Sequence, residues 1–123
     1  MFVKLLKSKL HRAKVTKTKL HYPGSVAIDP EIMEAAGILP HEFVLIADIE
    51  NGNRLQTYAV PAEPGSGDIV ILGAAAKLVK QDDLVIIFSF GYCDTEESRQ
   101  IRPKVVTFDH TEKANQIKEV TQK

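Results

Sequence analysis

Turn signals divide this chain into short apolar segments, and no other feature of the sequence constrains the fold as much. Clusters of Pro and Gly, the Asn51-Gly52 pair and polar turns separate stretches that alternate in polarity or are rich in Val, Ile and Leu. Segments of this length are typical of strands. We expect a small β-barrel built from strands at residues 2–7, 9–15, 26–28, 42–50, 54–60, 69–72, 84–90 and 105–108.

One stretch carries the signals of a helix instead. Asp29-Pro30-Glu31 combines a carboxylate suited to the N-cap, a proline suited to the first helical position and an acid in the first turn. Gly37 is a typical C-terminal residue, so the helix has about two turns. Asn51-Gly52 predicts a hairpin with a type I′ turn, in which both central residues have positive φ.

Length and composition predict a single domain over residues 1–123. No apolar run approaches the ~20 residues of a membrane span, and the lysine-interrupted N-terminus does not fit a signal peptide. Cys93, the one cysteine, cannot form an internal disulfide. We therefore expect a cytoplasmic protein. Residues 109–123 are polar and without pattern, which predicts a loosely ordered tail.

The formal net charge is zero, but basic residues gather before the first acid, Asp29. A nucleic-acid arm, a strand with one solvated basic face and a cationic pocket for a small anion would each explain them. Apolar residues interleave the run, which favours the strand over a nucleic-acid arm. The basic residues are Lys4, Lys7, Lys9, Arg12, Lys14, Lys17 and Lys19.

The pair Gly24-Ser25 follows Pro23 and precedes the strand at 26–28. As geometry it is a turn, since Pro fixes one φ angle and Gly adopts conformations that other residues resist. The pair also contains the functional groups needed to cleave its own peptide bond. A serine hydroxyl can attack the preceding carbonyl, which a glycine leaves unshielded.

Other chemistries find less support in the sequence. The four histidines are widely spaced and Cys93 has no partner in sequence, so we expect no metal site. Gly65-Ser66-Gly67 lacks the Lys-Ser/Thr of a phosphate-binding loop. The residue types of a Ser-His-Asp triad are present, but there is no nucleophile-elbow sequence.

Several motifs, in their order and spacing, closely resemble the bacterial pyruvoyl-dependent aspartate 1-decarboxylases, which make β-alanine for pantothenate. The resemblance covers about residues 1–108. It rests on the runs Lys9–Thr16, Leu20–Asp29, Ala35–Leu39, Asn51–Arg54 with Thr57-Tyr58, Gly73–Ala76 and Asp83–Ile87.

The resemblance implies a six-stranded double-psi β-barrel, assembled as a homotetramer with active sites between subunits. It implies a proenzyme that cleaves itself between Gly24 and Ser25 into chains 1–24 and 25–123, with Thr57 assisting. The Ser25 hydroxyl converts the amide to an ester, β-elimination leaves dehydroalanine, and hydrolysis gives a pyruvoyl group and ammonia. That carbonyl forms an imine with L-aspartate, and the imine takes up the electron pair left on the substrate when CO₂ departs. The resemblance implies no metal and no pyridoxal phosphate.

The resemblance also assigns roles to individual residues. Tyr58 matches the proton donor to the carbanion, and Arg54 the residue that grips a substrate carboxylate. The other substrate-binding positions implied by the resemblance are Lys9, His11, Tyr22, Thr57, Gly73, Ala74 and Ala75.

One departure from the family pattern is Leu72, where many members carry Asn, whose amide can form hydrogen bonds near the pocket. It leaves two alternatives beside the active enzyme. One is a poorly processed proenzyme, and the other is a non-enzymatic β-barrel that binds a partner through its basic strand. The sequence does not decide whether cleavage is spontaneous or needs a maturation factor.

Overall fold

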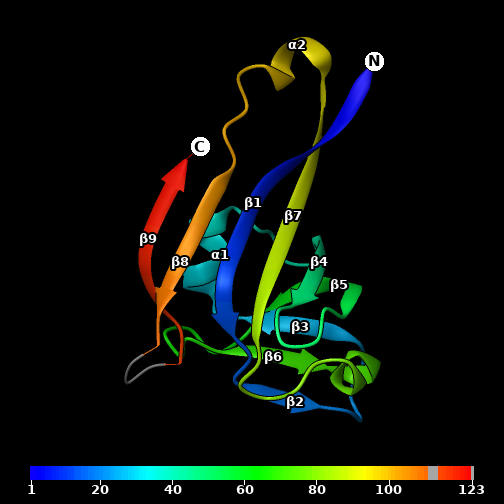
Figure 1. Cartoon of the computed structure of the whole chain (residues 1–123), viewed down its shortest axis with the longest axis vertical. Helices are drawn as coiled ribbons and strands as arrows, with labels where there is room; N and C mark the ends of the chain where they lie inside the picture. Colours follow the sequence, from blue (N-terminus) through cyan, green and yellow to red (C-terminus); the bar gives the residue numbers. More distant parts are fainter. Residues whose placement is uncertain (111–113, 123) are drawn as a thin grey trace.

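The computed structural model describes residues 1–110 and 114–122, and strands dominate it (Figure 1). The described residues form one nine-stranded sheet in the order β2-β6-β3-β5-β4-β7-β1-β8-β9. The mainly β architecture agrees with the small β-barrel expected from the sequence. The elements are β1 (Phe2–Lys14), β2 (Lys17–Lys19), β3 (Ser25–Ile28), α1 (Pro30–Ala36), β4 (Phe43–Asp48), β5 (Arg54–Pro61), β6 (Ile69–Leu72), the 3-10 helix η1 (Gly73–Lys77), β7 (Leu84–Asp94), α2 (Thr95–Ser98), β8 (Lys104–Asp109) and β9 (Gln116–Gln122).

The core lies where two groups of strands cross. In Figure 1, β1, β7, β8 and β9 run upright, and β2, β3 and β6 lie across the lower end of β1 and β7. One cluster of buried side chains draws on both groups, with Leu10 from β1, Ile28 from β3 and Ile87 from β7 among its fully buried members. Burial of such aliphatic side chains stabilises the fold by roughly 1.5–3 kcal/mol each.

The helix is confirmed at the predicted position. The Asp29 carboxylate accepts a hydrogen bond from the Glu31 amide at 3.0 Å. Pro30 is the first residue of α1, and Gly37 ends it with φ +71°. The predicted hairpin at Asn51-Gly52 is also confirmed, but the turn type is wrong. Only Gly52 has positive φ, because residues 49–52 form a longer turn closed by a hydrogen bond from the Asp48 amide to the Asn53 carbonyl.

Two predicted boundaries in the N-terminal part are wrong. Residues 2–14 form one strand instead of two. The pairing of this strand with β7 has two register shifts, and the first lies near the predicted break between the two strands. At one of them Arg12 adopts a φ of +60°. Residues 17–19, which lie outside the predicted strands, form β2, which pairs in parallel with β6. Backbone hydrogen bonding to β6 stabilises this polar segment, and polarity patterns do not report such pairing.

The chain end also differs from the loosely ordered tail expected over residues 109–123. Within its described part, β9 pairs antiparallel with β8. The side chain of Asn115, only 3% exposed, accepts a hydrogen bond from the Lys14 amide and donates to the carbonyls of Lys14 and Gly67. Ile117 packs against the core. One buried amide and one apolar residue are too weak a pattern to reveal a strand from sequence. Residues 111–113 and 123 lie outside the described residues.

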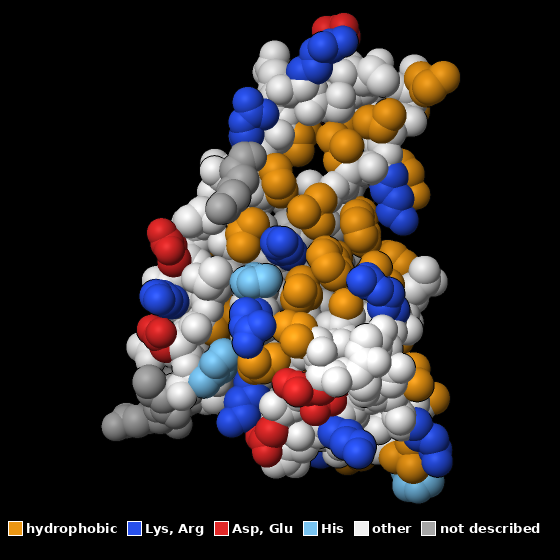
Figure 2. All heavy atoms as spheres, viewed as in Figure 1, with side chains coloured by type: hydrophobic (Ala, Val, Ile, Leu, Met, Phe, Trp, Pro, Cys, Tyr) orange, Lys and Arg blue, Asp and Glu red, His pale blue; other side chains and the backbone are white. Residues whose placement is uncertain are grey.

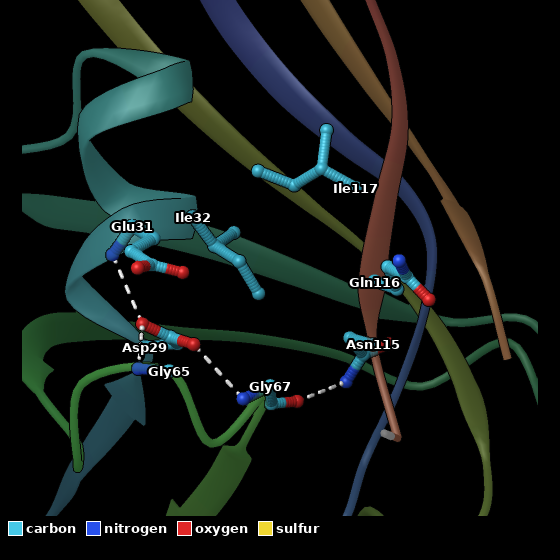
Figure 3. A pocket seen from close by; sticks show the side chains of 8 residues that line it. All are labelled: Asp29, Glu31, Ile32, Gly65, Gly67, Asn115, Gln116 and Ile117. Atoms are coloured by element: carbon cyan, nitrogen blue, oxygen red, sulfur yellow. Dashed lines mark hydrogen bonds between the residues drawn. The ribbon is translucent and has the colours of Figure 1, made fainter. Parts of the chain in front are cut away.

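Figure 3 shows how Asp29 and Asn115 hold the loop between β5 and β6. Asp29 accepts hydrogen bonds from the amides of Gly65 at 3.2 Å and Gly67 at 2.8 Å. Asn115 reaches Gly67 from the opposite side. Gly67 cannot be replaced without movement, because a Cβ there would lie 2.7 Å from the Asn115 carbonyl oxygen. The loop, α1 and the start of β9 are thereby fixed to one another.

Replacing Asn115 should therefore destabilise the whole domain. Asn115→Ala removes three hydrogen bonds and leaves a buried amide and two carbonyls without them. We expect the free energy of unfolding to fall by about 2–4 kcal/mol, measured by urea denaturation. Gln122→Ala, at an exposed position of β9, is the control and should change it by less than about 0.5 kcal/mol. Equal stability of the two variants would mean that the C-terminal segment does not contribute to the fold.

Candidate active site

The Gly24-Ser25 peptide lies where the exposed approach to β3 becomes a buried strand. Gly24 is exposed, whereas Ser25 is 5% exposed. Ser25 is the first residue of β3 and pairs antiparallel with Leu72 at the end of β6. The sheet therefore holds the serine in place and leaves the carbonyl side of the bond at the surface.

Gly73 packs directly against this peptide. It has φ +85°, and a Cβ built on it would lie 2.7 Å from the Gly24 Cα and 2.9 Å from both the Gly24 amide nitrogen and the Tyr22 carbonyl oxygen. No side chain fits there without displacing backbone. Gly24 is different: a Cβ on it would meet nothing within 4 Å, and no residue from 22 to 25 has positive φ. The steric requirement for glycine therefore falls on Gly73.

A cavity of about 450 Å³ opens beside this contact. Thr57 and Tyr58 of β5 form part of its wall, and Ala74 and Ala75 of η1 form another part. Thr57 is half-buried and Tyr58 is more exposed, at 39%. The sequence did not single out three further lining residues, and no pattern marks them: Leu55, Gln56 and Leu78.

Tyr58 is held from the side by the residues before β4. Its ring lies 6.2 Å from that of His41, which has φ +70°. The amide of His41 donates to the Ala59 carbonyl at 2.7 Å, and the Ala59 amide donates to Glu42. These bonds fix His41 and β5 to each other. His41 is thus a neighbour of Tyr58 that sequence reasoning missed.

Leu72 also lines the cavity, directly across the ladder from Ser25. A leucine side chain offers neither donor nor acceptor, so the cavity lacks here the amide that many family members carry. The remaining polar side-chain atoms of its wall come from Gln56, Thr57 and Tyr58. Side-chain hydrogen bonding in this cavity is therefore limited to these three residues.

The structure does not bring every predicted site residue to this cavity. Arg54 is exposed at the start of β5 and does not line it. Tyr22 is 54% exposed, and the Lys19 ammonium lies 5.2 Å from the centre of its ring. Only the backbone carbonyl of Tyr22 lies close to Gly73. Lys9 and His11 line a different cavity, on the outer face of β1. Within one chain, only part of the predicted set is assembled.

One other acid has a perturbed pKa but lies outside the cavity. Burial, aided by the nearby Asp83 carboxyl, raises the pKa of Asp48 at the end of β4 to about 6. From about pH 4 to pH 6 the unfolded chain loses this proton first, so the free energy of unfolding decreases as pH rises through that window. This acid affects stability at the β4–β5 hairpin and does not line the cavity beside Gly24.

Among the described residues, no group of three or more His, Cys, Asp or Glu side chains could hold a metal ion. None of the helices described is long and apolar enough to cross a membrane.

Comparison with known proteins places the chain in a family. The family model described as aspartate decarboxylase matches residues 1–117. The chain is 50% identical to an aspartate 1-decarboxylase of Acetivibrio thermocellus over 118 residues, which is 96% of this chain and 94% of that protein. It is 49% identical to one of Thermosipho africanus over 115 residues, 94% of each chain. An aspartate 1-decarboxylase of Carboxydothermus hydrogenoformans is 46% identical over 119 residues, 97% of this chain and 94% of that protein. The chain belongs to the aspartate decarboxylase family.

Proposed function

We propose that this chain is a self-processing enzyme that converts L-aspartate to β-alanine and CO₂, using a pyruvoyl group formed from Ser25. One observation carries the proposal within a chain of this family. Gly73 holds the Gly24-Ser25 peptide against a cavity whose wall includes Thr57 and Tyr58. The residues present fit a pyruvoyl group. Its source, Ser25, is buried at the start of β3, and the backbone of Gly24 beside it packs so closely on Gly73 that no side chain fits at position 73.

Processing starts from the Ser25 hydroxyl and the Gly24 carbonyl carbon. Attack of Oγ forms an ester as the amide C–N bond breaks, and a proton moves to the nitrogen of residue 25. Loss of the Cα proton of residue 25 then releases chain 1–24 as a carboxylate and leaves dehydroalanine. Hydrolysis gives the pyruvoyl group and ammonia. Thr57, which lines the same cavity as Gly24, is the residue proposed to assist the attack.

The finished group supplies an electron sink for decarboxylation. Tyr58 would donate a proton to the carbon that loses CO₂, and Arg54 would bind a substrate carboxylate through its guanidinium fork. Ala74 and Ala75 leave room for the substrate. We assign Lys9, His11 and Tyr22 to substrate contacts as well.

The dispersed positions of these residues favour an assembly of several copies. Arg54, Lys9 and His11 do not line the Gly24 cavity of their own chain, so a second copy would have to bring them there. Exposed aromatic side chains offer surface for such contacts, among them Phe2 at 75% exposure and Phe43 at 44%. We propose a homotetramer of six-stranded double-psi barrels with active sites between subunits, located in the cytoplasm.

Cleavage and decarboxylation can be tested on the purified protein. Denaturing mass spectrometry should find fragments 1–24 and 25–123, with a pyruvoyl group in place of the serine. L-Aspartate should then yield β-alanine. Ser25→Ala should remain one chain and produce none, because it lacks the attacking hydroxyl.

An intact wild-type chain after prolonged warming, with no β-alanine formed, would contradict the proposal and leave a non-enzymatic barrel. If a cell extract restores cleavage of that chain, a maturation factor is required. Native mass spectrometry of the same sample should give four copies, and a monomer would remove the shared site from the proposal.

Gly73→Ala should slow the cleavage by about tenfold or more. The left-handed φ alone costs an alanine about 1–2 kcal/mol, and its Cβ would push Gly24 away from its present position. The measurement is the fraction of cleaved chain against time on a denaturing gel. Gly91→Ala is the matched control, since a Cβ there meets nothing within 4 Å. Equal cleavage rates in the two variants would show that the contact with Gly73 does not position the peptide.

Tyr58→Phe should cleave normally but decarboxylate about 100-fold more slowly, which is within the range for loss of a general acid. Tyr58 is 39% exposed, so loss of the hydroxyl leaves no buried gap. The readout is β-alanine formed per cleaved chain. Tyr92→Phe, at an exposed position of β7, should keep the wild-type rate. Normal turnover by Tyr58→Phe would reject Tyr58 as the proton donor.

A further inference from the structure

The cavity beside Gly24 lies between two walls that no strand joins. β5 and β6 flank β3 in the sheet, but β3 begins only at Ser25. Its parallel pairing with β5 sets Val26 opposite Ala59, so residues 54–57 of β5 run past the start of β3. On the other side, η1 continues the chain past the end of β6. These two extensions form the walls of the cavity.

Two asparagine side chains join the walls where the sheet does not. The side-chain amide of Asn53, the residue before β5, donates to the Leu78 carbonyl at 2.9 Å. The side-chain amide of Asn51 donates to the same oxygen at 3.2 Å. Leu78 is the C-cap of η1 and lines the cavity, and so does Leu55 at the start of β5. The two bonds therefore fix the separation of the walls at this end of the cavity.

The hairpin that carries both asparagines is itself fixed by local hydrogen bonds. The backbone amide of Asn53 donates to Oδ1 of Asn51 at 2.8 Å. The Gly52 amide donates to the Asp48 carbonyl, also at 2.8 Å. A donor that local bonds already hold in place loses little conformational entropy when it binds a distant acceptor. The hairpin is therefore suited to hold Leu78, although the two segments are distant in sequence.

The chain after Leu78 is held independently of the asparagines. Val79 is fully buried, and the Lys80 amide donates to the Asp83 carboxylate at 3.0 Å in the turn before β7. Figure 2 shows acidic side chains gathered at the lower end of β7, where this turn leads into the strand. The Leu78 amide donates to the carbonyl of the lining residue Ala75 at 2.9 Å. Loss of the asparagine bonds would therefore release η1 and leave the turn in place.

We propose that Asn51 and Asn53 are positioning residues that set the width of the Gly24 cavity, and with it the length of substrate that the cavity accepts. The inference rests on the proposed function, which makes this cavity the site of L-aspartate decarboxylation. Neither asparagine lines the cavity, so both act through Leu78. With the walls joined, an amino acid one methylene longer than L-aspartate lacks room. With the walls released, the longer molecule gains affinity relative to L-aspartate.

The bonds to Leu78 are poorly suited to a purely structural role. They are open to water, since Asn51 is exposed and Leu78 is 41% exposed. Hydrogen bonds of this kind contribute little to the free energy of unfolding, because water replaces them when they are lost. A purely structural role would change the amount of folded enzyme, and this would affect every substrate equally. A change in the preference between two substrates therefore identifies a positioning role.

The test compares the cleaved wild-type protein with the double variant Asn51→Asp, Asn53→Ala. Asn51→Asp keeps the oxygen that accepts the backbone amide of residue 53 but has no donor for Leu78, and Asn53→Ala removes the other donor. The added charge acts on L-aspartate and L-glutamate alike. β-Alanine formation is measured with L-glutamate as a competing ligand. The ratio of its inhibition constant to the KM for L-aspartate should fall about tenfold, because a fitted pocket discriminates one methylene by at least that factor.

Glu50→Gln, at an exposed position of the same hairpin, leaves both bonds to Leu78 intact and is the control. Its ratio should equal that of the wild type. Asn53→Ala alone should lower the ratio by a smaller factor, and it replaces the double variant if that protein does not fold. An unchanged ratio, whatever the rates, would overturn the inference and leave the proposed function standing. A wild-type protein that forms no β-alanine would overturn both.

Discussion

The close contact between Gly73 and Gly24 is the constraint on which the rest of the candidate site depends. The two backbones pack so closely that a Cβ on Gly73 would lie only 2.7 Å from the Gly24 Cα. The antiparallel pairing of β3 with β6 brings the two glycines together, because Ser25 and Leu72 are opposite each other and the glycines are their neighbours. A side chain at position 73 would displace the peptide that the proposed chemistry must open.

The other end of β3 is fixed just as firmly. Asp29 follows the strand directly and caps α1. Its carboxylate also accepts hydrogen bonds from two backbone amides of the loop that leads into β6. That loop is held in turn by Asn115. The four-residue strand carrying Ser25 is thus anchored by sheet pairing along its length and by a buried carboxylate at its end. A short strand held in this way would keep its first residue in place if the chain before it were cut, as the proposed processing requires.

The sequence predicted the parts of the fold that local chemistry determines. The cap at Asp29, the glycine at position 37 and the hairpin around Gly52 each depend on residues close in sequence. It did not predict β2 and β9, whose polar residues are ordered by pairing with strands distant in sequence. For the same reason the site was only partly predictable. Thr57, Tyr58 and Gly73–Ala75 meet around Gly24, but Lys9 and His11 line a different cavity, and no local pattern in the chain reveals that separation.

The division of the predicted residues between two cavities bears on how the enzyme could work. Lys9 and His11 are separated within the chain from the peptide that they are proposed to serve, and they face a wall supplied by the C-terminal strand. If a second copy closes the gap, β9 enters the shared site together with β1, since the two strands are joined through β8.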